Sequence, residues 1–478
     1  MSPPDGGRRL RVGVVGGGWA GCAAAVDLAR AGWDVTLFEA ARTLGGRARA
    51  VHARGKAIDN GQHILLGAYD ATLALLKRVG VDPAASLLRL PLQMRYPAAC
   101  DGTPQLDFVA PRLPAPLHML AALLRARGLD RADKLALARF TTSARWMGWQ
   151  LNADCSVAEL LERFDQTPRL VRLLWQPLCV AALNTPAERA SARVFLAVLR
   201  DSLGARRAAS DMLLPRVTLD ALFPDAARRW LAAHGATVTP GTRVDAIAPE
   251  DGRWRIAAAG DLRLFDAVVL ATPPWETATL LRPLAPLADT VTQLDALAYE
   301  PITTVYLQYA PDLRLPLPFC ALLDAPADGR WGQFVFDRGQ LDAFHAGLLA
   351  VVVSAAGDAA AVDRDALAAA VGAQLAAAFG LPALGQPAWH TTITEKRATF
   401  SCTPGLARPD NATPLAGLVL AGDYTACDYP ATLESAVRSG AAAARILSRD
   451  LRSPSQGARP PAPRSVQYED RHNGRSSP

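Results

Sequence analysis

Several common protein classes are excluded by what this chain lacks. Its seven cysteines are scattered and include no CxxC pair, so the spacing offers no zinc or iron–sulfur site and no metal is expected. The same pattern favours a reducing, cytoplasmic location. The longest apolar run, residues 346–357, is far shorter than the ~20 residues that a membrane-spanning helix needs. The N-terminus is short and polar, without the apolar core of a signal peptide, so we expect no secretion.

Lysine is also scarce, and arginine carries nearly all of the positive charge behind the net charge of +6. The arginines do not gather into runs, so we expect no nucleic-acid partner. Half of the 478 residues are hydrophobic and 20% are charged, which is typical of a globular chain. This length exceeds one ordinary core and predicts two or three domains.

The strongest pattern that is present lies in residues 12–39. An apolar strand leads into Gly16, Gly18 and Gly21, a helical pattern follows, and a second strand ends at Glu39. In a dinucleotide-binding unit the first glycine allows the tight turn, the second lets the backbone approach a pyrophosphate, and the third lets the helix pack on the sheet. The acid stands 39 − 21 = 18 positions after the last glycine, close to the roughly 20 at which it reaches a ribose hydroxyl. The pattern therefore predicts a dinucleotide site without a 2′-phosphate.

The next segment, residues 44–49 (LGGRAR), resembles the second motif of flavoproteins in the amine oxidase and phytoene desaturase superfamily. This resemblance implies that the cofactor is FAD and that Gly45, Gly46 and Arg47 contact its pyrophosphate. It also implies that the backbone of a strand valine, here Val244, lies against the adenine.

A third piece of the same resemblance lies near the C-terminus. The apolar strand 417–421 is followed by Gly422 and Asp423, and the resemblance places this aspartate at the ribityl chain. The Ala-rich helix 431–447 then directs its N-terminal N–H groups at the flavin pyrimidine, where negative charge gathers on reduction. The expected cofactor-binding residues are Gly16, Gly18, Trp19, Ala20, Gly21, Glu39, Ala40, Gly45, Gly46, Arg47, Gly61, Gln62, His63, Val244, Gly422, Asp423, Thr432 and Leu433.

Two further segments narrow the resemblance. Residues 59–69 (DNGQHILLGAY) and 175–186 (WQPLCVAALNTP) are similar to the hydroxysqualene dehydroxylase family of bacterial hopanoid biosynthesis, also called squalene-associated FAD-dependent desaturases. The resemblance runs from about residue 11 to about residue 451. It implies reductive dehydroxylation of hydroxysqualene to squalene, by acid-assisted loss of an allylic hydroxyl and hydride transfer from N5 of the reduced flavin. An external reductase or a transient visit by NAD(P)H fits as the electron donor.

The sequence offers few proton donors for this reaction. The candidate catalytic residues are Asp59, His63 and Glu434. His63 has an ordinary pKa near neutrality, although a histidine in a glycine-rich loop is more often a structural hydrogen-bonding group. Asp59 serves either catalysis or the loop, and Glu434 is either an acid or a solvated helix residue. The candidate pocket residues in the cap are Trp175, Asn184 and Thr185, with plain core packing as the alternative for Trp175.

The expected fold is α/β, with a Rossmann-like FAD-binding domain and an inserted α+β substrate domain of the amine oxidase and phytoene desaturase type. Three separate stretches of the chain, 10–85, 210–274 and 391–451, are expected to build the FAD-binding domain. The other segments are a flexible N-terminus (1–9), a helical cap (86–209), the substrate-domain sheet (275–390) and a disordered tail (452–478). The substrate is expected between the sheet and the cap. Expected cap helices are 117–127, 134–150 and 170–182; elsewhere we expect helices 71–79, 220–234 and 364–379 and strands 236–239, 303–309 and 348–354.

Residues 113–140 combine leucines with arginines in the basic amphipathic pattern of an interfacial helix. We expect a peripheral contact with the inner face of the cytoplasmic membrane here, which would suit an apolar C30 isoprenoid substrate. An ordinary cap helix with its apolar stripe turned inward is the alternative.

Two other function classes stay open on the sequence alone. One is an oxidative flavoenzyme, either a phytoene- or carotenoid-type polyene desaturase or an amine oxidase, although with 6% aromatic residues no segment indicates the aromatic cage that amine oxidation usually needs. The other is a non-catalytic flavin-binding partner of the prenyl synthases that make the substrate. Product analysis with hydroxylated and saturated substrates separates the first from the dehydroxylase.

Overall fold

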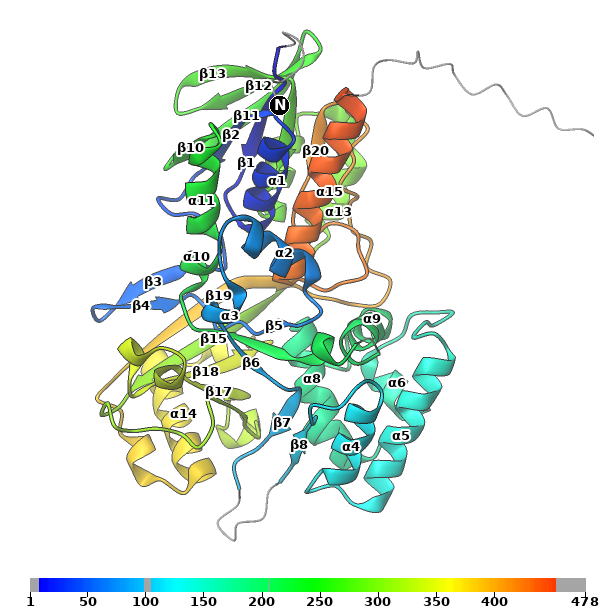
Figure 1. Cartoon of the computed structure of the whole chain (residues 1–478), viewed down its shortest axis with the longest axis vertical. Helices are drawn as coiled ribbons and strands as arrows, with labels where there is room; N and C mark the ends of the chain where they lie inside the picture. Colours follow the sequence, from blue (N-terminus) through cyan, green and yellow to red (C-terminus); the bar gives the residue numbers. More distant parts are fainter. Residues whose placement is uncertain (1–7, 99–104, 205, 453–478) are drawn as a thin grey trace, which may run out of the picture.

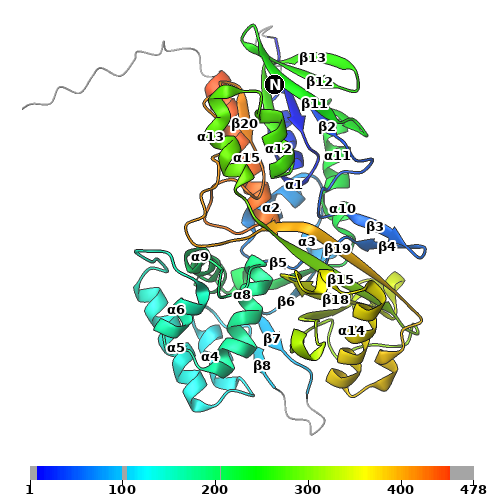
Figure 2. The same cartoon turned by 180° about the vertical axis from the view of Figure 1, so that it is seen from behind.

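The computed structural model describes residues 8–98, 105–204 and 206–452 (Figure 1). The expected flexible N-terminus and disordered tail fall almost entirely outside these ranges. Seen from either side, one half of the molecule holds the parallel sheet and the other half holds an antiparallel sheet beside a group of helices (Figures 1 and 2).

Segments from the whole length of the chain build the parallel sheet. Its strand order is β10-β2-β1-β14-β20. The strands are β1 (Arg11–Val15), β2 (Asp34–Glu39), β10 (Thr237–Pro240), β14 (Ala267–Leu270) and β20 (Leu418–Leu420). Strands β1, β14 and β20 are short apolar runs, as expected of parallel strands that are covered on both faces. The expected strand 236–239 is confirmed as β10, one residue later.

Helices cover one face of this sheet and a small antiparallel sheet covers the other. Helix α1 (Trp19–Arg30) packs against α11 (Pro224–Ala233) and α15 (Leu433–Arg452). On the opposite face lie β11 (Val244–Glu250), β12 (Arg253–Ala258) and β13 (Asp261–Phe265). Gly13 in β1 leaves room for this layer, because a Cβ there would lie 2.3 Å from the Ile256 side chain. The first motif therefore sits at the centre of a three-layer domain.

The second sheet is antiparallel, in the order β16-β17-β18-β15-β19. Its strands are β15 (Tyr299–Gln308), β16 (Phe319–Ala321), β17 (Phe334–Asp337), β18 (Leu348–Ser354) and β19 (Trp389–Phe400). Helix α14 (Arg364–Phe379) covers one face through Leu367, Val371 and Leu375, all buried. The predicted strand 348–354 and helix 364–379 are confirmed without a change of boundary, and the predicted strand 303–309 lies mostly within β15.

The cap is helical, as expected. It contains α4 (Leu117–Arg125), α5 (Arg131–Trp146), α6 (Val157–Arg163), α7 (Pro168–Leu170), a π-helical turn (Val171–Trp175), α8 (Gln176–Leu183) and α9 (Ala192–Leu203). Helix α5 starts three residues before the expected position, because Asp130 and Asp133 form a capping box. The predicted helical segment 170–182 is confirmed, and its first part, Val171–Trp175, is a π-helical turn.

Shorter elements connect these domains. They are β3 (Ala50–Ala53), β4 (Lys56–Asp59), β5 (Leu65–Leu66), α2 (Asp70–Arg78), α3 (Pro83–Ser86), β6 (Leu87–Leu90), β7 (Gln93–Arg95), β8 (Asp107–Val109), β9 (Met212–Pro215), α10 (Leu219–Leu222), α12 (Pro274–Leu281) and α13 (Ala288–Asp295). The predicted helix 220–234 is divided into α10 and α11 at Pro224. In the described ranges, no helix has the length and apolar character required to span a membrane.

Candidate functional site

The glycine loop after β1 forms a cradle on the helix that follows. Gly16 has φ +104° and a Cβ there would lie 2.5 Å from the Ala271 carbonyl oxygen, while a Cβ on Gly21 would lie 1.9 Å from the Gly16 oxygen. Both positions therefore require glycine for the fold itself. A Cβ on Gly18, in contrast, would meet no described protein atom within 4 Å. Gly18 caps α1 without a side-chain hydrogen bond, and the first turn contains no acid. This open, uncapped helix start fits a pyrophosphate.

Glu39, at the end of β2, holds the loop from the other side. Its Oε2 accepts a hydrogen bond from the Gly17 N–H and its Oε1 accepts one from the Ala41 N–H, both at 2.7 Å. Each carboxylate oxygen keeps a second lone pair, so Glu39 still has acceptors for ribose hydroxyls. The neighbouring Ala40 is exposed.

The second motif lies directly against the first. The Gly45 N–H donates to the Gly17 oxygen at 2.9 Å, and Gly45 pairs with Gly18 in an isolated bridge. Gly45 and Gly46 have φ of +111° and +61°, values at which glycine is favoured. The two glycine motifs thus lie side by side at the start of α1.

Arg47 and Asp423 bring the two ends of the chain together. Arg47 Nη2 lies 2.7 Å from both carboxylate oxygens of Asp423, and Arg47 Nη1 donates to the Ala398 carbonyl at 2.6 Å. Burial lowers the pKa of Arg47, but the pairing with Asp423 outweighs burial and the pKa is raised. The resemblance implies that the arginine contacts the pyrophosphate and the aspartate the ribityl chain, and in the structure these two side chains contact each other.

The loop after β4 rests on a buried polar network that sequence reasoning missed. Tyr306 Oη donates to the Asp59 carbonyl and receives a hydrogen bond from Gln62 Nε2, both at 2.7 Å. Arg338, which is 4% exposed, donates to Gln62 Oε1 at 3.1 Å. Tyr306 comes from the middle of β15 and Arg338 from just after β17, so only the folded sheet brings them under the loop.

The carboxylate of Asp59 belongs to the same network. Its Oδ1 accepts the Leu219 N–H at 2.8 Å, and its Oδ2 lies 4.0 Å from Arg338 Nη2. Burial raises the pKa of Asp59 to about 6, in spite of the nearby Arg338 charge. Asp59 therefore fixes the start of α10 to the loop.

His63 follows the loop and is half-buried. Its Nδ1 lies 2.9 Å from the Gly61 carbonyl, to which only a protonated nitrogen can donate. Burial lowers the pKa of His63 below its ordinary value of 6.5, and the Arg47 charge acts in the same direction. The neutral ring therefore carries its proton on Nδ1 and leaves Nε2 without one.

Glu434 has a structural environment rather than that of a free acid. Its carboxylate is fully buried and accepts hydrogen bonds from the Ala71 and Thr72 N–H groups, at 3.1 and 2.9 Å, and from Thr72 Oγ1 at 2.7 Å. Arg438 Nε donates to the same group at 2.7 Å. Glu434 thus caps the start of α2 from the first turn of α15, where both helix dipoles favour a negative charge.

The three cap candidates also have structural contacts. Trp175 is 1% exposed, packs against Phe140 and Phe195, and donates to Gln166. Asn184 is buried in a left-handed conformation and binds the Glu300 oxygen, Thr399 Oγ1 and the Ala355 N–H. Thr185 accepts the Cys402 N–H. The core alternative for Trp175 is the one that its packing supports, and the other two join the cap to the antiparallel sheet.

The remaining cofactor candidates lie around the parallel sheet. Trp19 and Ala20 are buried in the first turn of α1, and Val244 is buried at the start of β11. Gly422 follows β20, where a Cβ would lie 2.2 Å from the Tyr424 ring. Thr432 and Ser435 bond each other's backbone N–H across the start of α15, which begins at Leu433.

One buried polar atom below the loop has no protein partner. Thr304, on β15, is 1% exposed, and its Oγ1 makes no hydrogen bond within the described structure. This oxygen would lie 3.8 Å from a Cβ placed on Gly61. An unpaired hydroxyl beside the loop, together with the open space at Gly18, fits a bound group that supplies polar atoms.

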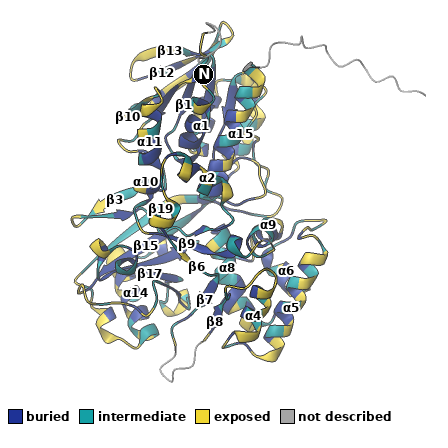
Figure 3. Ribbon diagram, in the orientation of Figure 1, coloured by how far each residue is buried: buried dark blue, intermediate teal, exposed yellow. Residues whose placement is uncertain are grey.

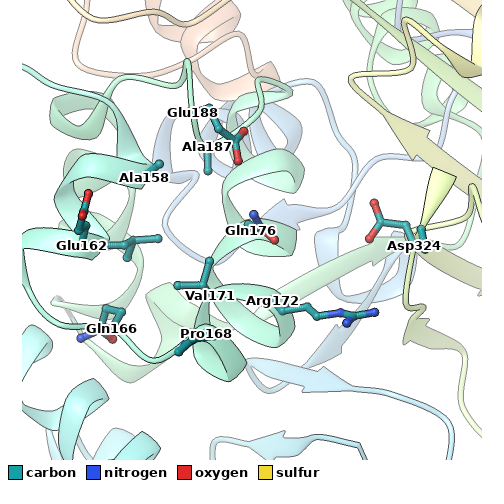
Figure 4. A pocket seen from close by; sticks show the side chains of 12 residues that line it. Ala158, Glu162, Gln166, Pro168, Val171, Arg172, Gln176, Ala187, Glu188 and Asp324 are labelled. Carbon is teal, nitrogen blue, oxygen red and sulfur yellow. The ribbon is translucent and has the colours of Figure 1, made fainter. Parts of the chain in front are cut away.

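A cavity of about 660 Å³ lies between the cap and the antiparallel-sheet domain (Figure 4). It is lined by residues of α6, the π-helical turn and α8 and by the loop after β16. Glu162, Arg172, Glu188 and Asp324 are among its lining residues. Most of its lining residues belong to the cap, and its charged lining does not suit a hydrocarbon chain.

Comparisons with known proteins show which families and folds this chain is similar to. The chain matches the model of the flavin-containing amine oxidoreductases over residues 19–448. It is 30% identical to hydroxysqualene dehydroxylase from Rhodopseudomonas palustris, over 91% of this chain and 98% of that protein. It is 26% identical to zeta-carotene desaturase from Synechocystis, over 92% and 97%. A putative protoporphyrinogen oxidase from Exiguobacterium has a similar fold, with a TM-score of 0.67 at 20% identity, over 94% and 100% of the two chains.

Proposed function

The chain belongs to the flavin-containing amine oxidoreductase family and, within it, to the hydroxysqualene dehydroxylases, and we propose that it reduces hydroxysqualene to squalene with loss of the hydroxyl group. The observation that carries this function is the likeness to a hydroxysqualene dehydroxylase over nearly the full length of both proteins. The protein is accordingly an FAD-dependent oxidoreductase.

The described residues fit FAD. The uncapped start of α1 and the open space at Gly18 would receive the pyrophosphate, and Glu39 would accept from the ribose. Gly45 and Gly46 line the same cradle, and Arg47 and Asp423 stand beside it. Reduced flavin, when bound, supplies a hydride to an electrophilic carbon.

The protein's own contribution to the chemistry is a proton for the leaving hydroxyl and a site without water. Among the three candidate acids, Asp59 and Glu434 are buried and bonded to backbone N–H groups. His63 is half-buried, and its Nδ1 is occupied by the Gly61 carbonyl. We therefore propose that protonated His63 donates from Nε2 to the substrate hydroxyl.

The lowered pKa of His63 predicts how the rate of squalene formation depends on pH. Because the pKa lies below 6.5, the imidazolium is a minor species at neutral pH, and its share grows as the pH falls. Single-turnover squalene formation should therefore rise on acidification in the wild type. In His63→Gln it should be slower by about 10²-fold and lose this pH dependence. An unchanged profile in His63→Gln would remove the histidine from the mechanism.

The function itself is tested anaerobically. The flavin is reduced chemically, hydroxysqualene is added in detergent, and flavin reoxidation is followed while the C30 product is extracted. Squalene formed in step with reoxidation supports dehydroxylation. A flavin that stays reduced, in an enzyme whose oxidised form bleaches with a polyene or an amine, would contradict it. The likeness to zeta-carotene desaturase makes the polyene the first alternative substrate to include.

A further inference from the structure

The outer face of α4 carries leucines that the cap leaves uncovered. Leu117, Leu120 and Leu124 are 53%, 53% and 67% exposed, and Leu113 just before the helix is 38% exposed. We call these four residues the α4 stripe. Within α4, Leu117, Leu120 and Leu124 are spaced by three and four positions, which places them along one side of the helix. His118 and Ala122, in contrast, are buried against the rest of the cap.

Basic side chains surround the α4 stripe. Arg112 precedes it, and Arg125, Arg127 and Arg131 follow it; all four residues are exposed. Lys134 on α5 donates to the Leu124 carbonyl at 3.0 Å, which brings the start of α5 to the end of the stripe. Leu135, the next residue, is 65% exposed. An apolar strip with a basic border is complementary to a surface that is apolar inside and anionic at its rim.

The position of α4 in the molecule leaves this face accessible. Helices α4 and α5 lie in the half of the molecule away from the parallel sheet. Parts of both helices are coloured as exposed (Figure 3). Of the other exposed large apolar residues, Leu135 and Trp146 lie on α5, whereas Leu262 on β13 and Leu381 after α14 lie on separate elements. Single exposed residues of this kind are ordinary, whereas four exposed leucines close together in residues 113–124 are not.

We propose that the α4 stripe and its basic border dock the protein on an anionic phospholipid bilayer. The leucines enter the apolar boundary of the leaflet while the arginines and Lys134 pair with lipid phosphates. The proposal rests on the proposed function for its purpose, because hydroxysqualene and squalene dissolve in a bilayer and not in water. Within the expected docking segment 113–140, the proposed contact surface is the α4 stripe and its basic border.

The test measures vesicle binding without any substrate. Full-length protein is floated with vesicles of phosphatidylglycerol and phosphatidylethanolamine, and with vesicles of phosphatidylcholine alone. Leu120→Gln/Leu124→Gln keeps the net charge and uses a good helix-forming residue. It should lower the partition coefficient on anionic vesicles at least about tenfold. Leu262→Gln, a change of the same kind on an exposed leucine of the other half, should bind like the wild type.

Three further measurements decide the outcome. Binding should weaken with added salt and be much weaker on phosphatidylcholine vesicles, because lipid charge contributes to it. With substrate dispersed in detergent, the double variant should turn over at the wild-type rate, whereas with substrate held in vesicles it should be slower.

Equal flotation of the double variant and the wild type would overturn the proposal. So would a double variant that changes only the oligomeric state in sedimentation, since the stripe would then be covered by a second copy. Failure of squalene formation with intact vesicle binding would contradict the proposed function and leave the docking surface standing.

Discussion

Arg47 and Asp423 are 376 positions apart in the sequence, yet one guanidinium nitrogen of Arg47 lies 2.7 Å from both carboxylate oxygens of Asp423. The arginine follows the second glycine motif and the aspartate follows the last strand of the parallel sheet. The pair therefore joins the first and last segments of the dinucleotide-binding domain at the cofactor cradle. Stability of the domain and affinity for FAD should both depend on it.

We expect Arg47→Gln to destabilise the protein even without cofactor. The Asp423 side chain is 11% exposed and would lose its ion-pair partner. Breaking a fully buried pair costs about 3–5 kcal/mol, and because Arg47 itself is about one-third exposed we expect about 2 kcal/mol. Urea unfolding of the apoprotein measures this change. Arg42→Gln, an exposed arginine in the same segment, is the control and should leave the midpoint unchanged.

Alanine at two glycines of the first motif should affect different properties, FAD affinity at Gly18 and stability at Gly21. Gly18→Ala meets no described protein atom within 4 Å, so its melting temperature should fall only by the small cost of alanine at a helix N-cap, while its FAD dissociation constant rises at least about tenfold. Gly21→Ala places a Cβ 1.9 Å from the Gly16 oxygen and should lower the melting temperature of the apoprotein itself. Melting curves and flavin-fluorescence titration distinguish the two effects. Equal FAD affinity of Gly18→Ala and wild type would contradict the cradle.

Glu434→Gln tests whether this residue is structural. The glutamine can accept one of the α2 N–H groups but loses the charge that faces two helix starts and Arg438. We expect a loss of about 1–3 kcal/mol in the free energy of unfolding. The FAD-loaded variant should keep its single-turnover rate. A large fall in that rate, at unchanged stability, would return Glu434 to the catalytic residues.

The carboxyl of Asp59 should make stability depend on pH. Its pKa is raised from 3.8 in the unfolded chain to about 6 in the fold, so the folded state binds the proton more tightly. The stabilisation is complete below 3.8 and is lost as the pH rises through about 6. The free energy of unfolding of the wild type, relative to Asp59→Asn, should thus fall by about 3 kcal/mol between about pH 4 and about pH 7. A constant difference between the two proteins would contradict the buried carboxyl.

Local patterns were enough for much of the fold. The glycine spacing and the flanking apolar runs predicted the first βαβ unit, and the periodicity of residues 348–354 and 364–379 predicted β18 and α14 without error. Such elements are set by neighbouring residues. The π-helical turn at Val171–Trp175 was not predictable in this way, because a helix period does not reveal where a neighbouring element widens one turn.

The functional assignments also separate into those that depend on neighbouring residues and those that depend on tertiary packing. The sequence by itself determined the dinucleotide motif, the family and the basic amphipathic character of residues 113–140, since each depends on residues close together in the chain. Only the tertiary structure decided that Arg47 pairs with Asp423, that Glu434 caps α2, that Tyr306 and Arg338 hold the loop after β4, and which leucines of α4 face outward. The physical reason is distance along the chain: hydrogen bonds, ion pairs and burial at these positions join segments that are far apart in sequence and meet only when the layers pack.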